Sequence, residues 1–206
     1  LCISDRRVYR SLAPRLGQEG RRLAVYGFLT CLEERELHLW RFLRLGYDRG
    51  PWVVRDLTAD RVAVLTRAVG HLTGEAHLLK GFTRFSEQEG VLVGEIAPKN
   101  RVLPLLRPHF CARYPEESFV LYDRTHREAL FYRPRRWAIV PLEAFRAAAP
   151  GREERDFRRL WRRFYDTSAI EGRENPRCRM TQMPKRFWGT MTEFQNETEE
   201  RKELAP

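Results

Sequence analysis

Three side chains in the sequence have the chemistry of an acid–base site. His77 and His109 each stand beside a helix-like stretch, and an imidazole exchanges a proton near neutral pH. Asp123 ends an apolar run, where its carboxylate could orient a histidine or could simply form a turn. One hypothesis is an enzyme in which His77 and His109 act as acid and base with Asp123 as the orienter. The alternative for each histidine is a helix cap or a hydrogen-bonded core position.

A second set of residues is suited to binding a polyanion. The segment from Arg152 to Trp188 carries eleven basic and six acidic residues, a net charge of +5. Basic side chains neutralise phosphates, and aromatic rings stack on exposed bases. The candidate nucleic-acid contacts are Arg84, Arg173, Asn175, Arg179, Lys185, Arg186 and Trp188. The alternative is that the aromatic residues of this segment are core and its arginines a solvated face.

The charge of the whole chain favours the same class of partner. Its 206 residues include 38 Lys and Arg against 28 Asp and Glu, which gives a formal net charge of +10. Such an excess attracts polyanions through steering and counterion release. Thirty-four of the basic residues are arginine. A GC-rich coding sequence explains this preference for arginine over lysine as well as a functional role does.

Several chemistries are absent from the sequence. It contains no GxxxxGK[ST] or GxGxxG phosphate loop, no GxSxG elbow and no HExxH zinc helix. The four cysteines stand at 2, 31, 111 and 178 without a CxxC pair, so we predict no metal and no cofactor. They also cannot hold a radical-SAM cluster, and they suit a reducing cytoplasm. The longest apolar run, Leu23 to Leu32, is too short to cross a bilayer, which argues against a membrane partner.

Hydrophobic periodicity predicts the helices that would position these residues. Apolar residues recur every three to five positions over 21–45, with Gly46 as the expected stop, and again over 60–77. A short helical stretch after Asn100 is expected to be interrupted at Pro108.

Beyond Gly81 the period falls to two, which is typical of strands. A hairpin is predicted around Glu89-Gly90, followed by strands at 119–123, 129–133 and 137–140 whose short connections require antiparallel pairing. The fold class is therefore α+β, with helices packed on a small, mainly antiparallel sheet and a basic helical C-terminal extension.

The composition predicts three parts. Residues 1–150 form an α+β core domain, residues 151–194 the basic extension, and residues 195–206 a flexible tail. The extension contains an apolar helical stripe formed by Phe157, Leu160, Trp161, Phe164 and Tyr165. We expect the loop 173–185 that follows this stripe to be a contact surface, because Pro176 and Pro184 fix its backbone.

Five segments resemble an uncharacterised bacterial family of DNA-metabolism proteins. They are LWRFLRLG at 39–46, GEAHLLKGFTRF at 74–85, LPLLRPHF at 103–110, RENP at 173–176 and MPKRFW at 183–188. The resemblance implies a role in DNA repair or modification beside a radical-SAM protein, and some members are fused to a uracil-DNA-glycosylase-like domain. Phe187 stands where the family more often has Tyr, which removes a hydroxyl but keeps a stacking face.

These observations predict a cytoplasmic, nucleic-acid-binding accessory subunit in DNA repair or modification. Its expected partners are DNA, a radical-SAM protein that performs the chemistry, and a uracil-DNA-glycosylase-like domain. The alternative is an enzyme that acts directly on a DNA base or on the sugar-phosphate backbone through His77, His109 and Asp123. A third hypothesis, a protein-binding adaptor, predicts a basic surface that is dispersed instead of clustered.

Overall fold

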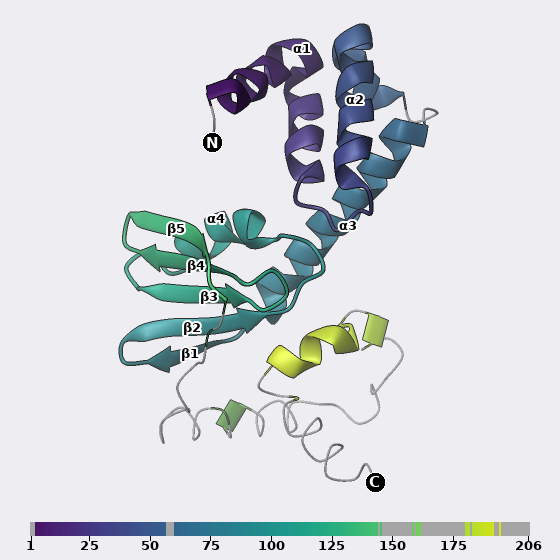
Figure 1. The fold of residues 1–206 in the computed structure, drawn as a ribbon. Helices are drawn as coiled ribbons and strands as arrows, with labels where there is room; N and C mark the ends of the chain where they lie inside the picture. The colour runs from purple at the N-terminus through teal and green to yellow at the C-terminus, as the bar shows by residue number, and fades with distance from the viewer. Residues whose placement is uncertain are drawn as a thin grey trace. The chain divides into compact units, whose positions relative to one another are not determined.

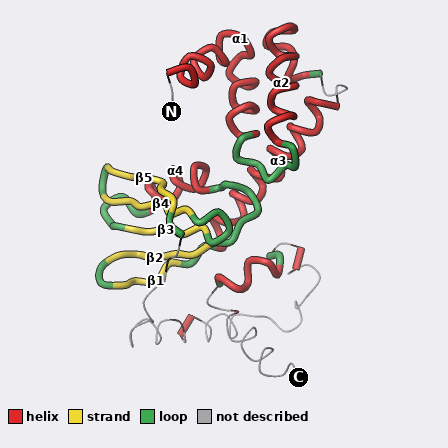
Figure 2. The backbone as a smooth tube through the Cα atoms, in the orientation of Figure 1, coloured by secondary structure: helices red, strands yellow, loops and turns green. Residues whose placement is uncertain are grey.

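The computed structural model describes residues 3–56, 60–143, 145, 158, 160–161, 180–181, 183–191 and 194. The chain divides into two compact units. A helical unit comprises 1–76 and 99–102, and a sheet unit comprises 77–98 and 103–206 (Figures 1 and 2). None of the described helices combines the length and the apolar character that a bilayer crossing requires.

The helical unit consists of α1 (Ile3–Gly27), α2 (Arg35–Arg49), the 3-10 helix η1 (Gly50–Arg55) and the first part of α3 (Asp60–Phe82). Burying an apolar side chain stabilises a fold by roughly 1.5–3 kcal/mol, and each of these helices contributes such side chains to one core. The core is formed by Leu12, Leu16, Leu23, Ala24, Leu39, Phe42, Val53, Val62 and Leu65.

The continuous helix predicted over 21–45 is wrong, because the chain turns between α1 and α2. The Thr30 hydroxyl donates to the carbonyl oxygen of Gly27 at 2.7 Å, and Glu34 has a left-handed φ of 48°. Gly46 is also not the end of α2. It is buried, and a Cβ there would lie 2.1 Å from Cδ2 of Leu16, so it permits the close approach of α1 and α2.

The sheet unit is built on five strands in the order β1-β2-β3-β4-β5. They are β1 (Phe85–Gln88), β2 (Val91–Ile96), β3 (Phe119–Asp123), β4 (Glu128–Arg133) and β5 (Arg136–Pro141). β2 and β3 are parallel and are joined through α4 (Leu103–Arg113), whereas the other three pairs are antiparallel. The α+β class, the hairpin at 89–90 and the three following strands are confirmed.

One face of the sheet packs against α4. Phe110 of α4 lies with its ring 5.2 Å from that of Phe85 and 6.5 Å from that of Phe119. α4 is continuous through Pro108, so the interruption predicted there is wrong. On the other face, the Phe145 ring lies 5.4 Å from that of Tyr122.

The C-terminal part is described in pieces. The 3-10 helix η3 (Lys185–Thr190) follows Pro184 as predicted, and it is anchored by Phe187, which is 2% exposed and lies 5.6 Å from Phe82. In the apolar stripe, Leu160 and Trp161 are helical but exposed, so Trp161 does not have the core position that is the alternative for the aromatic residues of this segment. The small, proline-containing stretch 147–151 is the linker expected at the boundary near 150. It and the rest of the stripe lie outside the described residues, so the domain limits at 150 and 194 stay predictions.

Candidate nucleic-acid interface

Asp123 is placed at the carboxyl end of β3 and is fully buried. Its Oδ1 accepts hydrogen bonds from the backbone N–H groups of Thr125 at 2.9 Å and His126 at 3.1 Å. Its Oδ2 lies 2.7 Å from Nδ1 of His126, whose side chain is 15% exposed. The carboxylate thus closes the β3–β4 turn and fixes the orientation of an imidazole.

The histidine that Asp123 orients is His126, and the sequence singled out His77 and His109 for that partnership. His77 is exposed on α3 and forms no hydrogen bond or ion pair within the described part of the chain. His109 is half-buried on α4, and its Nε2 is buried without a hydrogen-bond partner among the described residues. Burial lowers the pKa of His109, and the positive charges of Lys80 and Arg113 lower it further.

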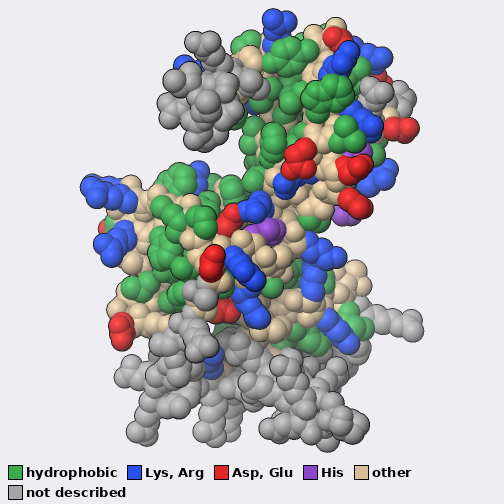
Figure 3. Space-filling model, viewed as in Figure 1, with side chains coloured by type: hydrophobic (Ala, Val, Ile, Leu, Met, Phe, Trp, Pro, Cys, Tyr) green, Lys and Arg blue, Asp and Glu red, His purple; other side chains and the backbone are tan. Residues whose placement is uncertain are grey.

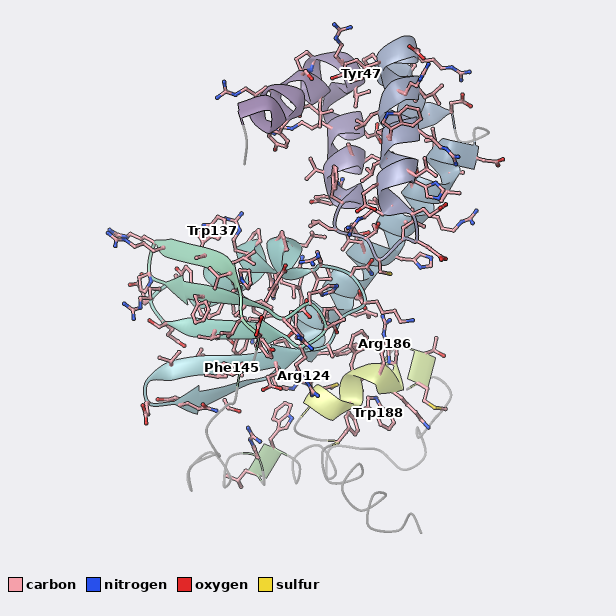
Figure 4. The ribbon with its side chains drawn as sticks, in the orientation of Figure 1. Tyr47, Arg124, Trp137, Phe145, Arg186 and Trp188 are labelled. Atoms are coloured by element: carbon pink, nitrogen blue, oxygen red, sulfur yellow. The ribbon has the colours of Figure 1, made fainter. Side chains whose placement is uncertain are left out.

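Four of the predicted nucleic-acid contacts lie in the described part of the sheet unit. The guanidinium of Arg84 donates to the carbonyl oxygen of Gly81 at 2.8 Å, which ties it to the end of α3. Lys185 and Arg186 are exposed on η3, and Nε1 of Trp188 donates to the carbonyl oxygen of Met183 at 3.0 Å (Figure 4). The Trp188 ring stacks on that of Phe194 at 4.6 Å. Arg173, Asn175 and Arg179 lie outside the described residues.

A denser basic cluster lies at the turn between β4 and β5. Arg133 and Arg136 are cross-strand partners, and Arg135 stands between them in the turn. All three side chains are exposed, and within the described residues none of them forms a hydrogen bond or an ion pair. Figure 3 shows basic side chains gathered at this end of the sheet. We call Arg133, Arg135 and Arg136 the hairpin arginines.

An arginine–tryptophan pair adjoins the hairpin arginines. Trp137 of β5 is 51% exposed, and its side chain projects from the sheet (Figure 4). The guanidinium carbon of Arg107, on α4, lies 4.1 Å from the centroid of the Trp137 ring. This distance is well within the range of a cation–π interaction. Because side chains alternate along β5, Trp137 lies on the face that α4 covers, whereas Arg133 and Arg136 point from the opposite face. The aromatic surface and the basic side chains therefore adjoin at the end of the β4–β5 hairpin.

Sequence reasoning missed this interface although its signal is visible. The run Arg133-Pro134-Arg135-Arg136-Trp137 places three arginines and a tryptophan within five residues at a predicted hairpin turn. Net charge summed over a long segment is high for 152–188, at +5. Such a sum hides a run of only five residues, because neighbouring acidic and neutral residues lower its average charge. The contribution of Arg107 comes from the fold alone, because it is 30 residues away in the sequence.

The helical unit contains a different polar site. Glu75 is 4% exposed, and its carboxylate accepts hydrogen bonds from the backbone N–H groups of Lys99 at 3.0 Å and Asn100 at 2.9 Å, and from Nδ2 of Asn100 at 2.7 Å. Oδ1 of Asn100 accepts from the N–H of Cys31 at 2.9 Å. A pocket of about 320 Å³ beside this network is lined by residues that include Arg67 and Asn100.

The described residues include no group of three or more His, Cys, Asp or Glu side chains placed to hold a metal ion. Among them, Cys111 is half-buried on α4, and burial raises the pKa of its thiol, an effect that Arg107 opposes. A raised thiol pKa means less thiolate at neutral pH, and the thiolate is the form that binds metals and acts as a nucleophile.

Comparison with known proteins identifies the family. The model of a family described as a domain of unknown function, DUF4130, matches residues 33–193, and the chain belongs to this family. The matched region includes the hairpin arginines, Trp137, the Asp123–His126 pair and η3. No curated protein and no solved structure matches the chain.

Proposed function

We propose that this protein is a nucleic-acid-binding accessory subunit in DNA repair or modification. It holds DNA through phosphate contacts of the sheet unit and presents a damaged site to a radical-SAM partner enzyme. The proposal of DNA as the ligand is supported by the charge of the chain and by the family resemblance of the five segments. The same resemblance supports the two proposed protein partners, the radical-SAM protein and a uracil-DNA-glycosylase-like domain.

The observation that carries the binding proposal is the cluster of hairpin arginines. Two like charges directly opposite each other on paired strands destabilise a sheet. Arg133 and Arg136 occupy such positions, and neither forms an ion pair with a described residue. Phosphate groups would supply the missing negative charge, and a guanidinium binds them through two parallel hydrogen bonds. The clustering also favours a nucleic-acid interface over the adaptor hypothesis, which predicts a dispersed basic surface.

The test is a salt titration of DNA binding. Affinity for a labelled oligonucleotide is measured by fluorescence anisotropy at several salt concentrations, for the wild type and for the triple variant R133Q/R135Q/R136Q. Each duplex phosphate contacted contributes about −0.9 to the slope of log K against log salt. We therefore expect the triple variant to bind more weakly and to have a slope shallower by about two to three.

A matched control separates a localised interface from net charge. The variant R10Q/R41Q/R67Q removes the same charge from exposed arginines of the helical unit. It should keep the wild-type slope. Equal losses in the two variants would favour a diffuse charge effect over the hairpin, and a wild type that does not bind DNA at low salt would refute the proposal.

A second candidate function rests on the Asp123–His126 pair. A buried carboxylate on Nδ1 leaves Nε2 of the same imidazole for proton transfer, as in acid–base enzymes. In this function the chain itself acts on a DNA base or on the sugar-phosphate backbone, with His126 in the role first assigned to His77 and His109. The variant His126→Gln would then abolish turnover of a lesion-containing oligonucleotide and leave its binding unchanged. Wild-type protein that leaves every such oligonucleotide intact would exclude this function.

A further inference from the structure

Trp137 is the outermost member of an aromatic row that crosses three strands. The register places Phe119 of β3 opposite Tyr132 of β4, and Tyr132 opposite Trp137 of β5. The rings of Phe119 and Tyr132 stack at 4.9 Å, and these two residues are 1% and 8% exposed. Trp137 is 51% exposed. The first two rings thus form the core, whereas half of the Trp137 surface faces solvent.

Trp137 of β5 is contacted by Arg107, which belongs to a different element, α4. Its guanidinium lies over the Trp137 ring, and the residue is half exposed with Arg107 in place. Two other exposed tryptophans, Trp40 and Trp52, pair with an arginine of their own helix: Trp40 with Arg44 at 5.5 Å, and Trp52 with Arg55 at 4.8 Å. The contact to α4 restrains the Trp137 ring against the body of the sheet unit. A restrained side chain loses less conformational entropy when a ligand binds.

We infer that Trp137 is a stacking site for an unpaired base of single-stranded DNA. This inference rests on the proposed function and names its substrate class. The base lies on the exposed surface of the indole. Side chains alternate along β5, so Arg136 and its partner Arg133 point to the opposite face of the sheet from Trp137. The hairpin arginines bind the flanking phosphates where the DNA strand passes around the end of the β4–β5 hairpin, at which Arg135 stands in the turn. Such a combination of an aromatic surface and a basic track is how proteins bind single strands without sequence preference.

The geometry favours a single strand over a duplex. In a duplex both faces of each base are covered by neighbouring bases, so that a ring on a sheet surface meets only groove edges and phosphates. The hairpin arginines serve either form of DNA, because both present phosphates. Only an unpaired base gives Trp137 a partner for its exposed surface. Trp137 should therefore determine the preference between the two forms, and the arginines the overall affinity.

The experiment compares binding of a labelled oligothymidylate and of a duplex of equal length. The variants are W137A, W137F, and W40A as a matched control, since Trp40 is 55% exposed and also pairs with an arginine. Loss of one stacked base should weaken single-strand binding roughly 5- to 150-fold in W137A. We expect an intermediate loss in W137F, wild-type affinity in W40A, and duplex affinities within about twofold throughout.

The outcomes separate this inference from the proposed function. If the wild type binds neither DNA at low salt, the proposed function fails and the stacking site fails with it. If the wild type binds but W137A retains full single-strand affinity, or loses single-strand and duplex affinity equally, only the stacking site is refuted. Tighter binding of an oligouridylate RNA than of the DNA strand, reduced in W137A, would also overturn the assignment to DNA. Thermal unfolding of W137A near the wild-type temperature shows that the loss is local.

Discussion

The helical unit and the β4–β5 hairpin differ in how many of their arginines have a partner. In the helical unit, many arginines have a partner within the same or the adjoining element: Arg35 with Glu36, Arg49 with Asp56, Arg21 with Tyr9, Arg44 with Trp40 and Arg55 with Trp52. Its buried carboxylate, Glu75, accepts three hydrogen bonds. In the sheet unit, the hairpin arginines have no such partner among the described residues.

This difference separates structural charges from charges that can serve a ligand. A paired or hydrogen-bonded group stabilises the fold, and removing it leaves its partner without a hydrogen bond or an opposite charge. An unpaired exposed arginine contributes little to stability, and a cluster of them contributes unfavourably. Substitution of the buried, hydrogen-bonded Glu75 should therefore change stability, whereas substitutions at the hairpin should change binding.

The largest expected effect tests whether the buried, hydrogen-bonded Glu75 stabilises the helical unit. Glu75→Gln replaces a carboxylate oxygen with an NH₂ group that faces N–H donors, and it removes a charge-assisted acceptor. We expect the free energy of unfolding of the helical unit to fall by about 2–4 kcal/mol. Urea unfolding, with hydrogen exchange in α1 and α2, measures this. The exposed Glu36→Gln should change stability by less than about 0.5 kcal/mol, and a similar loss in both variants would contradict the assignment.

A smaller effect sharpens the comparison at the hairpin. Arg135 has a φ of 64°, in the left-handed region, where glycine is free of strain and Arg is not. Arg135→Gly should raise the free energy of unfolding by about 0.5–1 kcal/mol and weaken DNA binding at the same time. Calorimetry and the salt titration measure the two changes.

The matched control is Arg127→Gly, because Arg127 has a φ of 53° in the β3–β4 turn. It should give a similar gain in stability with unchanged DNA binding. If Arg135→Gly destabilises the protein, or if Arg127→Gly weakens DNA binding as much, the division between structural and binding charges does not hold.

The smallest effect concerns pH. The pKa of His109 is lowered from its ordinary value of 6.5, so that the folded state binds fewer protons than the unfolded state as the pH falls below that value. His109 therefore reduces stability progressively below about pH 6.5 and has no such effect above it. His109→Gln should make the unfolding free energy less dependent on pH between 7 and 5. An unchanged pH profile in His109→Gln would contradict the shift.

The strands could be predicted from the sequence, whereas the limits of α1 and α2 could not. The strands are predicted from the alternation of apolar and polar residues and from the turn at Glu89-Gly90. This pattern depends only on residues adjacent in the sequence, so it can be read without knowing the fold. The break after α1 escaped prediction because Leu29 and Leu32 continue the helical spacing. Contacts distant in sequence fix that turn, among them the hydrogen bond from Cys31 to Asn100, 69 residues away.

The candidate site was predictable only in part, for the same reason. The sequence predicts Asp123 as a strand-ending carboxylate that could orient a histidine. Its partner His126 is not among the predicted site residues, and the pairing is seen only in the fold. The hairpin arginines are visible in the sequence as a short run. The exposure of Trp137 and its contact with Arg107 depend on the packing of α4, which no local pattern reports.

The hydrogen bonds of Glu75 have a consequence for the order in which the protein folds. Residues 99–102 belong to the helical unit, although the strands β1 and β2 before them and the helix α4 after them belong to the sheet unit. On the ribosome, which releases the chain from its N-terminus, the helical unit cannot be completed until the β1–β2 hairpin has been synthesised. An uninterrupted fragment that contains the whole helical unit must also contain residues 77–98, which belong to the sheet unit. Expression of 1–76 alone would leave Glu75 without the three donors that Lys99 and Asn100 supply.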